Sequence, residues 1–204
     1  MMNIITPQRL YHGTTDQFVA SFQQRLLNSQ YWRPGRDFGE GFYTTISAAQ
    51  ARKWAVKTAR SNFIGDARPC VLEIELLAMP PAIEPRIFLS DSIAWAEFIL
   101  SHRMADVKGE DPCSAHPDII IGPMADSDTG KILQEAIQLK KDITWFYDQI
   151  TKSMRGRRLD SLHLGNQVVF SSEKWESFLR LVGYNINIGG RWVYHENASA
   201  TEHV

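Results

Sequence analysis

Alternating apolar and polar residues predict several short strands in this chain. Val71–Leu77 alternates most regularly and is the clearest strand of the sequence. Arg9–Thr15 and Phe42–Ile46 are rich in β-branched and aromatic residues, which favour strands. Asp118–Gly122 is a short apolar run that predicts a buried strand, and His163–Phe170 predicts a further one.

Apolar residues at helical spacing predict helices between the strands. Ser47 is the expected N-cap of a helix over Ala48–Asn62. Further helices are expected from residues 90–92 to Met104, over Lys131–Lys141, over Trp145–Met154 and from Ser172 onward. Glu173 and Glu176 would then lie in the first turn of the last helix, where acidic residues interact favourably with the helix dipole.

The order of these elements predicts an α+β fold, with small helices packed around a split, mostly antiparallel sheet. With 204 residues, the chain is expected to form a single domain over residues 1–204. Asn187–Trp192 predicts a tight hairpin turn. Residues 185–204 are therefore expected to form a C-terminal hairpin and a flexible tail.

The charge balance argues against global attraction to nucleic acid or acidic membranes. Lys and Arg number 22 against 23 Asp and Glu, for a net charge of -1. The basic run Lys152–Arg158 could contact a nucleic-acid acceptor or simply form a solvated helix end. No apolar run approaches the ~20 residues that cross a bilayer, and no signal-peptide pattern is visible, so a cytoplasmic location without membrane contact is expected.

The cysteines and most of the histidines carry no predicted role. Cys70 and Cys113 are too few for a disulfide scaffold, and neither lies in a CxxC pair or near a histidine at zinc-finger spacing. Both sulfurs are interpreted as packing groups. The histidines without metal-ligand spacing are His102, His116, His163, His195 and His203. No metal site is expected.

Two segments combine chemically useful side chains with glycines that expose the backbone. In Tyr-His-Gly-Thr at 11–14, a histidine at a strand end is followed by a glycine, whose peptide edge can donate and accept hydrogen bonds to a planar amide. In residues 37–45, loop glycines let a ligand approach the main chain. The adjacent Phe42 and Tyr43 offer a face on which an aromatic ring can stack.

In this order, Leu-Tyr-His-Gly-Thr (10–14), Phe-Gly-Glu-Gly-Phe-Tyr-Thr-Thr (38–45) and Ser-Ala-Ala-Gln-Ala-Arg-Lys-Trp-Ala (47–55) resemble the ADP-ribosyltransferase superfamily. The resemblance is to the branch of diphtheria toxin and the poly(ADP-ribose) polymerases, marked by a His on one strand and a Tyr on the next. It is closest to an uncharacterised group of small bacterial proteins with this fold, several of which look like toxins or defence effectors. Weaker similarity extends over Asp118–Asp126 and Gln167–Leu181.

The resemblance implies a NAD-binding cleft between two halves of a split sheet. His12 would hydrogen-bond a hydroxyl of the nicotinamide ribose, and the Gly13 backbone would pair with the nicotinamide carboxamide. Tyr43 would stack on the nicotinamide ring, and Thr14 would reach the adenosine ribose. Trp54, eleven residues beyond Tyr43, would form a second aromatic wall; a core position on an amphipathic helix is the alternative.

One position departs from the family pattern. The family usually places a Glu on a late strand to steady the ribose in the transition state, whereas Gln167 stands at that position here. An amide can still hydrogen-bond the ribose 2′-hydroxyl, but it brings no negative charge. His12, Tyr43 and Gln167 form the implied catalytic set, and single transfer is expected rather than chain elongation.

Some polar residues have two interpretations. Asp126 and Asp128 could act as a base on an incoming acceptor or cap the following helix. Arg33, Arg36 and Asp37 could touch the adenosine or pyrophosphate of NAD, or belong to a solvated loop.

The expected activity is mono-ADP-ribosyl transfer from NAD, as substrate, to a protein or nucleic-acid acceptor. NAD glycohydrolysis and an inactive NAD- or partner-binding module are the alternatives. From the resemblance alone, the chain is also expected to be the toxin or effector of a toxin–antitoxin or phage-defence system, with an inhibitory protein as a partner.

Overall fold

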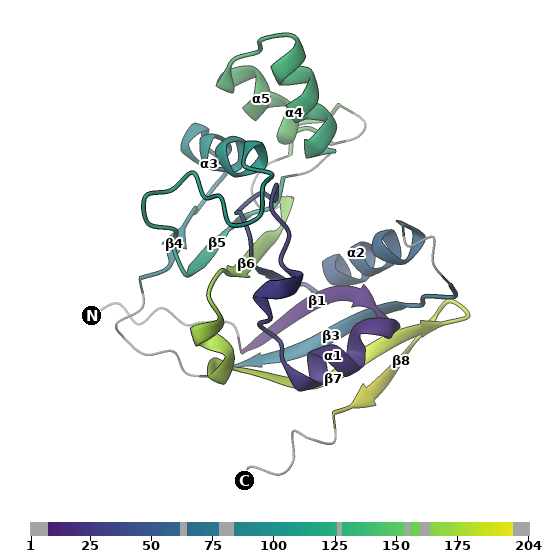
Figure 1. Ribbon diagram of the computed structural model, residues 1–204. Helices are drawn as coiled ribbons and strands as arrows, with labels where there is room; N and C mark the ends of the chain where they lie inside the picture. Colours follow the sequence, from purple (N-terminus) through teal and green to yellow (C-terminus); the bar gives the residue numbers. More distant parts are fainter. Residues whose placement is uncertain are drawn as a thin grey trace. The chain divides into compact units, whose positions relative to one another are not determined.

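The computed structural model describes residues 8–61, 65–77, 84–125, 128–153, 156–159 and 164–197 (Figure 1). They divide into two compact units. Unit 1 comprises the described residues within Met1–Asn28, Tyr43–Ile83 and Glu173–Val204, and unit 2 those within Ser29–Phe42 and Glu84–Ser172. Helices occur together with eight strands. The β4–β5 pair is parallel, and the β1–β2, β1–β3, β3–β7, β5–β6 and β7–β8 pairs are antiparallel. The predicted α+β class with a mostly antiparallel sheet is confirmed.

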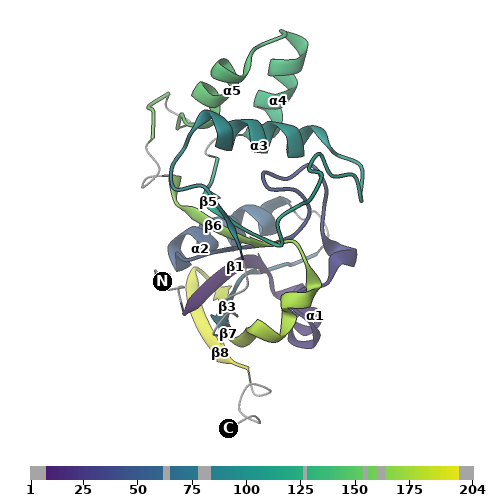
Figure 2. The ribbon, with the colours of Figure 1, turned by 90° about the vertical axis from the view of Figure 1, so that its left-hand side faces the viewer.

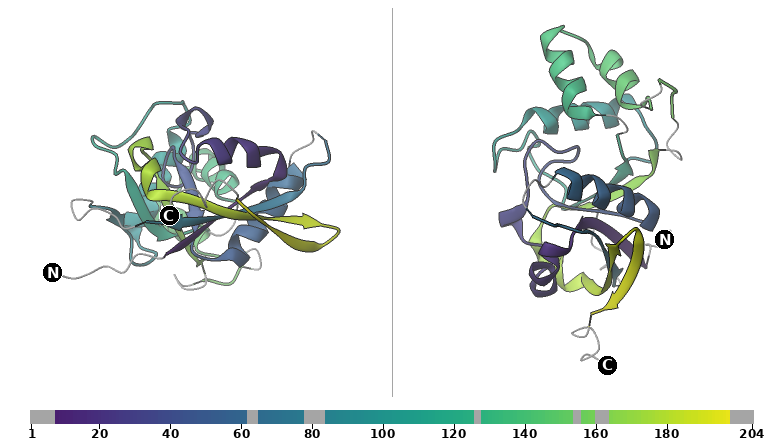
Figure 3. Two further views of the ribbon diagram at one scale, coloured as in Figure 1. Left: turned by 90° about the horizontal axis from the view of Figure 1, so that it is seen from below. Right: turned by 90° about the vertical axis from the view of Figure 1, so that its right-hand side faces the viewer.

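Unit 1 is built on strands in the order β2-β1-β3-β7-β8. The strands are β1 (Arg9–Thr15), β2 (Phe42–Thr45), β3 (Pro69–Leu76), β7 (Leu179–Ile188) and β8 (Arg191–Glu196). The helical segments are η1 (Asp16–Phe18), α1 (Val19–Gln24), α2 (Ala48–Ser61) and η3 (Glu173–Phe178). Helices α1 and α2 lie on opposite faces of these strands (Figure 3).

Unit 2 contains strands in the order β4-β5-β6. Helix α3 lies beside these strands, and α4 and α5 pack on the side of α3 that faces away from them (Figure 2). The strands are β4 (Arg86–Ile87), β5 (Ile119–Pro123) and β6 (Asn166–Phe170). The helical segments are η2 (Ser29–Tyr31), α3 (Ile93–Met104), α4 (Thr129–Gln138) and α5 (Ile143–Ile150). No helix within the described residues is both long and apolar enough to cross a membrane.

Local sequence explains why α2 begins where it does and packs closely on β1. The hydroxyl of Ser47 accepts a hydrogen bond from the Gln50 amide at 3.3 Å, which confirms the predicted N-cap. Ala51 and Ala55 on the inner face of α2 are buried against Val71 of β3. Their small side chains allow the helix backbone to approach the sheet.

The helix predicted from Ser172 onward is present only as a short 3₁₀ helix over Glu173–Phe178, with Glu173 and Glu176 in its first turn as predicted. This helix, η3, is followed at once by β7, which pairs antiparallel with β3 and then turns into β8. Buried residues alternate along the first half of β7, with Leu179 and Leu181 inward, and this period of two belongs to a strand. Gly189 and Gly190 both have positive φ, which confirms the predicted tight hairpin turn.

Candidate functional site

The main-chain groups of β1 have a defined direction at Gly13. The Asp16 amide donates to the Arg68 carbonyl, and the Gln8 carbonyl accepts from the Leu76 amide, so even-numbered residues direct their polar groups toward β3. Alternate residues of a strand direct theirs to opposite sides. The N–H and C=O of Gly13 therefore point away from β3, toward the β2 side.

Pairing with β2 stops just before Gly13. Among the described residues, the register between β1 and β2 consists of one pair, Tyr11 with Thr45, although β1 continues to Thr15. Gly13 is the next residue that directs its polar groups to this side. The N–H of Gly13, a donor, and its C=O, an acceptor, thus lie on one strand edge where the pairing of β1 with β2 ends. A primary carboxamide can bond to both groups.

The imidazole of His12 lies beside this edge. Its Nδ1 is 2.7 Å from the main-chain carbonyl oxygen of Tyr43. A carbonyl only accepts, so Nδ1 carries the hydrogen, and Nε2 of the neutral ring is an acceptor. Burial lowers the pKa of His12, and the bond to the Tyr43 carbonyl opposes that shift. The ring also packs against Phe22 of α1, with ring centroids 5.3 Å apart.

The imidazole and the phenol ring leave their strands on opposite faces. Tyr11 packs on the cluster that α2 forms with β3, and its partner Thr45 bonds Gln50 of α2. Side chains alternate along a strand, so Tyr43 is directed to the same face as Thr45, and His12 to the other. The predicted pair meets through the Tyr43 main chain and does not form one facing pair of side chains.

Trp54 lies on the same face as Tyr43, next to Gly13. A methyl group at Gly13 would meet the Ala51 carbonyl oxygen at 2.3 Å and Trp54 Cβ at 3.2 Å, so close packing of α2 requires a glycine. Trp54 is 42% exposed, with the Lys57 ammonium 5.1 Å from its ring centroid. The alternative that Trp54 is a core residue is therefore wrong.

The remaining predicted ligand-binding residues are buried. Thr14 in unit 1 and Phe42 in unit 2 are nearly inaccessible. Gln167 belongs to β6 of unit 2, opposite Gly122 of β5, and its amide donates to the Pro123 carbonyl at 3.5 Å. The participation of these three residues in one NAD site stays a prediction.

The two glutamates after β6 hold another segment of unit 1. Glu176 accepts hydrogen bonds from the Leu26 and Leu27 amides at 2.9 and 2.6 Å, and Glu173 pairs with Arg25 at 2.5 Å. Both carboxylates thus fasten the chain that follows α1. Both glutamates also lie in the first turn of η3, as predicted for the helix after Ser172.

Other polar candidates have structural partners, and Asp126 lies outside the described residues. Asp128 occupies the N-cap position of α4, makes no capping hydrogen bond with its side chain and pairs with Lys131 at 3.7 Å. Asp37 accepts from Arg103 Nε at 2.7 Å. In the basic run, Lys152 pairs with Asp148 and Arg158 with Asp91. The described ends of that run are therefore partly neutralised within unit 2.

The structure brings together four side chains to which the sequence analysis gave no role. One potential ligand atom from each of His102, Asp111, Cys113 and His116 lies within 4.8 Å of all the others. His102 lies in the last turn of α3, and the other three follow in the loop before β5. The sequence signal was present as Cys-x-x-His at 113–116, with a histidine eleven residues before the cysteine, but it fits no zinc-finger pattern.

Electrostatics in this cluster do not suit an activated cysteine. Burial lowers the pKa of His102, which favours the neutral imidazole, and burial followed by the Asp111 charge raises the pKa of the Cys113 thiol. A nucleophilic cysteine needs a lowered thiol pKa. A catalytic Cys–His pair is therefore not favoured here.

Comparisons with known proteins identify a family without assigning a function. A search of curated proteins and a search of solved structures returned no match. A family model described as "Protein of unknown function (DUF3990)" matches residues 8–181, most of the chain. The chain therefore belongs to this family of proteins of unknown function.

Proposed function

We propose that this protein is a NAD-dependent mono-ADP-ribosyltransferase that acts on a macromolecular acceptor. The sequence resemblance to His-Tyr ADP-ribosyltransferases motivates the proposal. One structural observation carries it: the N–H and C=O of Gly13 point to the side where pairing with β2 has ended.

This edge suits the nicotinamide half of NAD. The carboxamide would donate to the Gly13 carbonyl and accept from the Gly13 amide. Tyr43 and Trp54, directed to the same face, would flank the nicotinamide ring. His12 Nε2 is an acceptor and would take a hydrogen bond from a ribose hydroxyl, because Nδ1 donates to the Tyr43 carbonyl.

The reaction then requires cleavage of the bond between ribose C1′ and the nicotinamide nitrogen. Nicotinamide leaves with the electron pair of that bond as a neutral molecule, and a nucleophile of the acceptor attacks C1′ and loses its proton. Holding the leaving group and the ribose in place is how this site would lower the barrier. The sequence resemblance assigns Gln167 the role of a hydrogen-bond donor to the ribose, and its lack of charge favours single transfer over polymer growth.

The test is transfer of label from NAD carrying a radioactive phosphate in its ADP-ribose part. Wild type is expected to label protein or nucleic acid of a bacterial lysate, and His12→Ala is expected to lose most of that label. His12→Asn, which keeps an N–H near the position of Nδ1, controls for the bond to Tyr43. No label above that of a heat-inactivated sample would overturn the proposal.

Two further outcomes distinguish the alternatives. Free ADP-ribose and nicotinamide formed without an acceptor would identify an NAD glycohydrolase. Calorimetric binding of NAD without turnover would identify a binding module, consistent with the missing glutamate. The proposed role as a toxin with an inhibitory partner is tested separately: expression of the chain alone is expected to arrest growth, and His12→Ala to relieve the arrest.

A further inference from the structure

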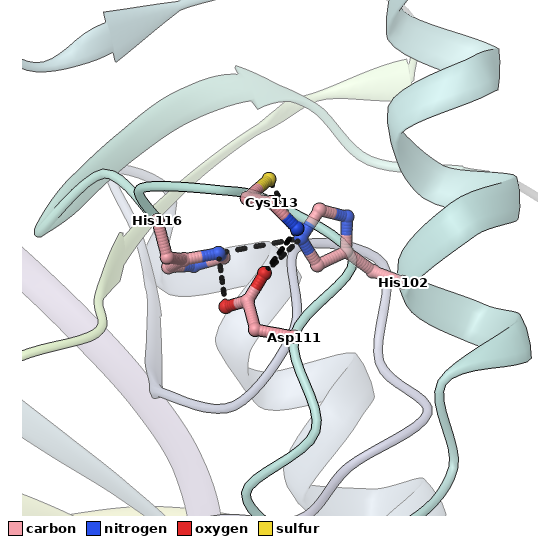
Figure 4. A group of neighbouring side chains, drawn as sticks. All are labelled: His102, Asp111, Cys113 and His116. Atoms are coloured by element: carbon pink, nitrogen blue, oxygen red, sulfur yellow. Dashed lines mark hydrogen bonds and ion pairs between the residues drawn. The ribbon is translucent and has the colours of Figure 1, made fainter.

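Four polar side chains of unit 2 converge on one point (Figure 4). His102 Nε2 lies 3.3 Å from His116 Nδ1, 3.5 Å from Cys113 Sγ and 3.6 Å from Asp111 Oδ1. Asp111 Oδ2 is 2.8 Å from His116 Nδ1. Two imidazoles, a carboxylate and a thiol thus face one another, with one potential ligand atom from each within 4.8 Å of all the others.

Two of these separations match the edges of a tetrahedral zinc site. With Zn–N of about 2.05 Å and Zn–S of about 2.3 Å, tetrahedral angles place two nitrogens about 3.3 Å apart and a nitrogen and a sulfur about 3.6 Å apart. The observed His102–His116 and His102–Cys113 distances are 3.3 and 3.5 Å. The His116–Asp111 distance of 2.8 Å is shorter and is that of a direct hydrogen bond, so this pair would separate by about half an ångström around an ion.

The outer nitrogens of both rings are held in the way that metal-bound histidines are held. His102 Nδ1 lies 2.7 Å from the Phe98 carbonyl oxygen, so Nδ1 donates and Nε2 presents its lone pair to the cluster. His116 Nε2 lies 3.2 Å from the hydroxyl of Ser171. Both rings therefore have a second partner that fixes their orientation.

Hydrogen bonds also connect these residues. The Cys113 thiol, 3.5 Å from His102 Nε2, can donate to that lone pair, and Asp111 Oδ1 accepts from the Cys113 amide at 2.7 Å. The lone pair of His102 Nε2 faces a carboxylate oxygen, which is also an acceptor, at 3.6 Å. A hydrogen on His116 Nδ1 is directed best at Asp111 Oδ2, at 2.8 Å. A cation at the centre would take the place of the thiol hydrogen and the imidazole hydrogen and would bind the sulfur, both ring nitrogens and a carboxylate oxygen at once.

We propose that His102, Asp111, Cys113 and His116 bind one zinc ion as four protein ligands. The Cys113 thiol loses its proton to solvent as the Zn–S bond forms, so one proton is released for each ion bound. One thiolate and one carboxylate then balance the two positive charges of Zn²⁺. Nitrogen and sulfur donors select zinc over magnesium and calcium, which prefer oxygen.

Four protein ligands leave no open coordination position, so the ion is structural. It would join the end of α3 to the loop before β5. Asp111 has a side chain 37% exposed and lines a hollow of about 240 Å³ together with His102 and His116, which gives an ion access. Gly39 packs directly on both rings, since a methyl group there would lie 2.9 Å from His102 Cδ2 and 3.1 Å from His116 Cε1. The ion would therefore also steady the loop that contains Gly39.

The experiment uses the full chain, stripped of metal with a chelator and titrated with Zn²⁺ against a chromophoric competitor. Wild type is expected to bind one equivalent. Substitution with Co²⁺ is expected to give the strong visible bands of four-coordinate cobalt and a thiolate-to-cobalt charge-transfer band in the near ultraviolet. Folding of each sample is checked by circular dichroism.

Matched variants locate the site. Cys113→Ala is expected to lose the charge-transfer band. Its zinc affinity is expected to fall by at least about 100-fold, because loss of a partner outside the ligand shell already costs up to about 100-fold. Cys70→Ala removes the other cysteine of the chain, which is buried in β3, and is expected to keep both. Asp111→Asn keeps the side-chain shape and is expected to lose at least about 10-fold. A folded wild type without the charge-transfer band, or a Cys113→Ala variant that binds zinc as wild type does, would overturn the proposal.

Discussion

The edge of β1 at Gly13 and the four-residue cluster of unit 2 present polar groups in different ways. At Gly13 the groups are main-chain atoms, and strand alternation fixes their direction. In the cluster they are side-chain atoms from the end of α3 and an irregular loop, oriented by bonds such as that from His102 to the Phe98 carbonyl. The direction of the Gly13 groups depends on the sheet and on the packing of α2. The cluster of unit 2 depends on the conformation of the loop between α3 and β5. Substitutions should therefore affect the two regions separately.

The largest effect is expected for Gly13→Ala. Its methyl group would lie 2.3 Å from the Ala51 carbonyl oxygen and 2.8 Å from the Ala55 amide, and both are backbone atoms that cannot turn away. Forced overpacking of this kind costs about 3 kcal/mol. Denaturant unfolding should show a loss of this size in the free energy of unfolding.

Gly130→Ala in α4 is the matched control. A methyl group at Gly130 has Asp128 Oδ1 as its nearest neighbour, at 3.6 Å, which is ordinary contact. Alanine favours a helix by up to about 1 kcal/mol over glycine, so this variant should be as stable as wild type or more stable. Equal losses from the two variants would contradict the packing explanation for Gly13.

A somewhat smaller effect is expected for Glu176→Ala in unit 1. The carboxylate accepts from two main-chain amides, those of Leu26 and Leu27. Hydrogen bonds to a charged group contribute about 1.5–3 kcal/mol, so the variant should lose about 2 kcal/mol in the free energy of unfolding. Glu176→Gln keeps one acceptor oxygen and should lose about half as much. If Glu176→Gln abolished NAD cleavage without loss of stability, the carboxylate would have a catalytic role instead.

Most of the secondary structure follows from local pattern. The strands over Arg9–Thr15 and Val71–Leu77 and the helix after Ser47 were predicted within a few residues, because alternation and capping are local properties. The strand β7 was not predicted, because the segment after Ser172 was interpreted as a helix, and only the short 3₁₀ helix η3 forms there. Pairing of β7 with β3, a long-range interaction, decides that segment in favour of a strand.

The Gly13 edge and the four-residue cluster of unit 2 also differ in how far the sequence alone could predict them. His12 and Gly13 are adjacent, so a motif reveals them, although the faces of the side chains depend on strand register. His102 and His116 are fourteen residues apart, and only the course of the loop between them brings the rings within 5.1 Å. Spacing alone could not show that both rings approach Cys113.

The acid stability of unit 1 should depend on His12. Burial lowers its pKa below the usual value of 6.5. As the pH falls through about 6.5, the unfolded chain binds a proton on this ring before the folded chain does. The stabilisation from the neutral ring is therefore complete above that pH and is lost as the pH falls toward the folded pKa.

Unfolding midpoints measured between about pH 5 and pH 8 test this direction. His12→Asn cannot titrate and should flatten part of the acid loss. His102 in unit 2 has a pKa lowered in the same direction, so some acid dependence should persist in that variant. A steeper acid loss in His12→Asn than in wild type would show that the sign assigned to His12 is wrong.

The smallest effect on stability is expected for Trp54→Ala, although it should weaken NAD binding. The ring is 42% exposed, so its removal should change the free energy of unfolding by no more than about 0.5 kcal/mol. Stacking on an aromatic ring contributes about 0.5–1.5 kcal/mol, so the Kd for NAD should rise by up to about 10-fold. Calorimetry measures the binding, and denaturant unfolding the stability.

Trp145→Ala in α5 is the matched control, since that ring also packs under a lysine, with Lys141 Nζ 5.8 Å from its centroid. It belongs to unit 2 and should leave the Kd for NAD unchanged. If both tryptophan variants bound NAD as wild type does, Trp54 would be no part of a nicotinamide site. Binding of NAD at Gly13 would then depend on main-chain hydrogen bonds alone. The exposed position of Trp54 beside Gly13 would need an explanation other than stacking on nicotinamide.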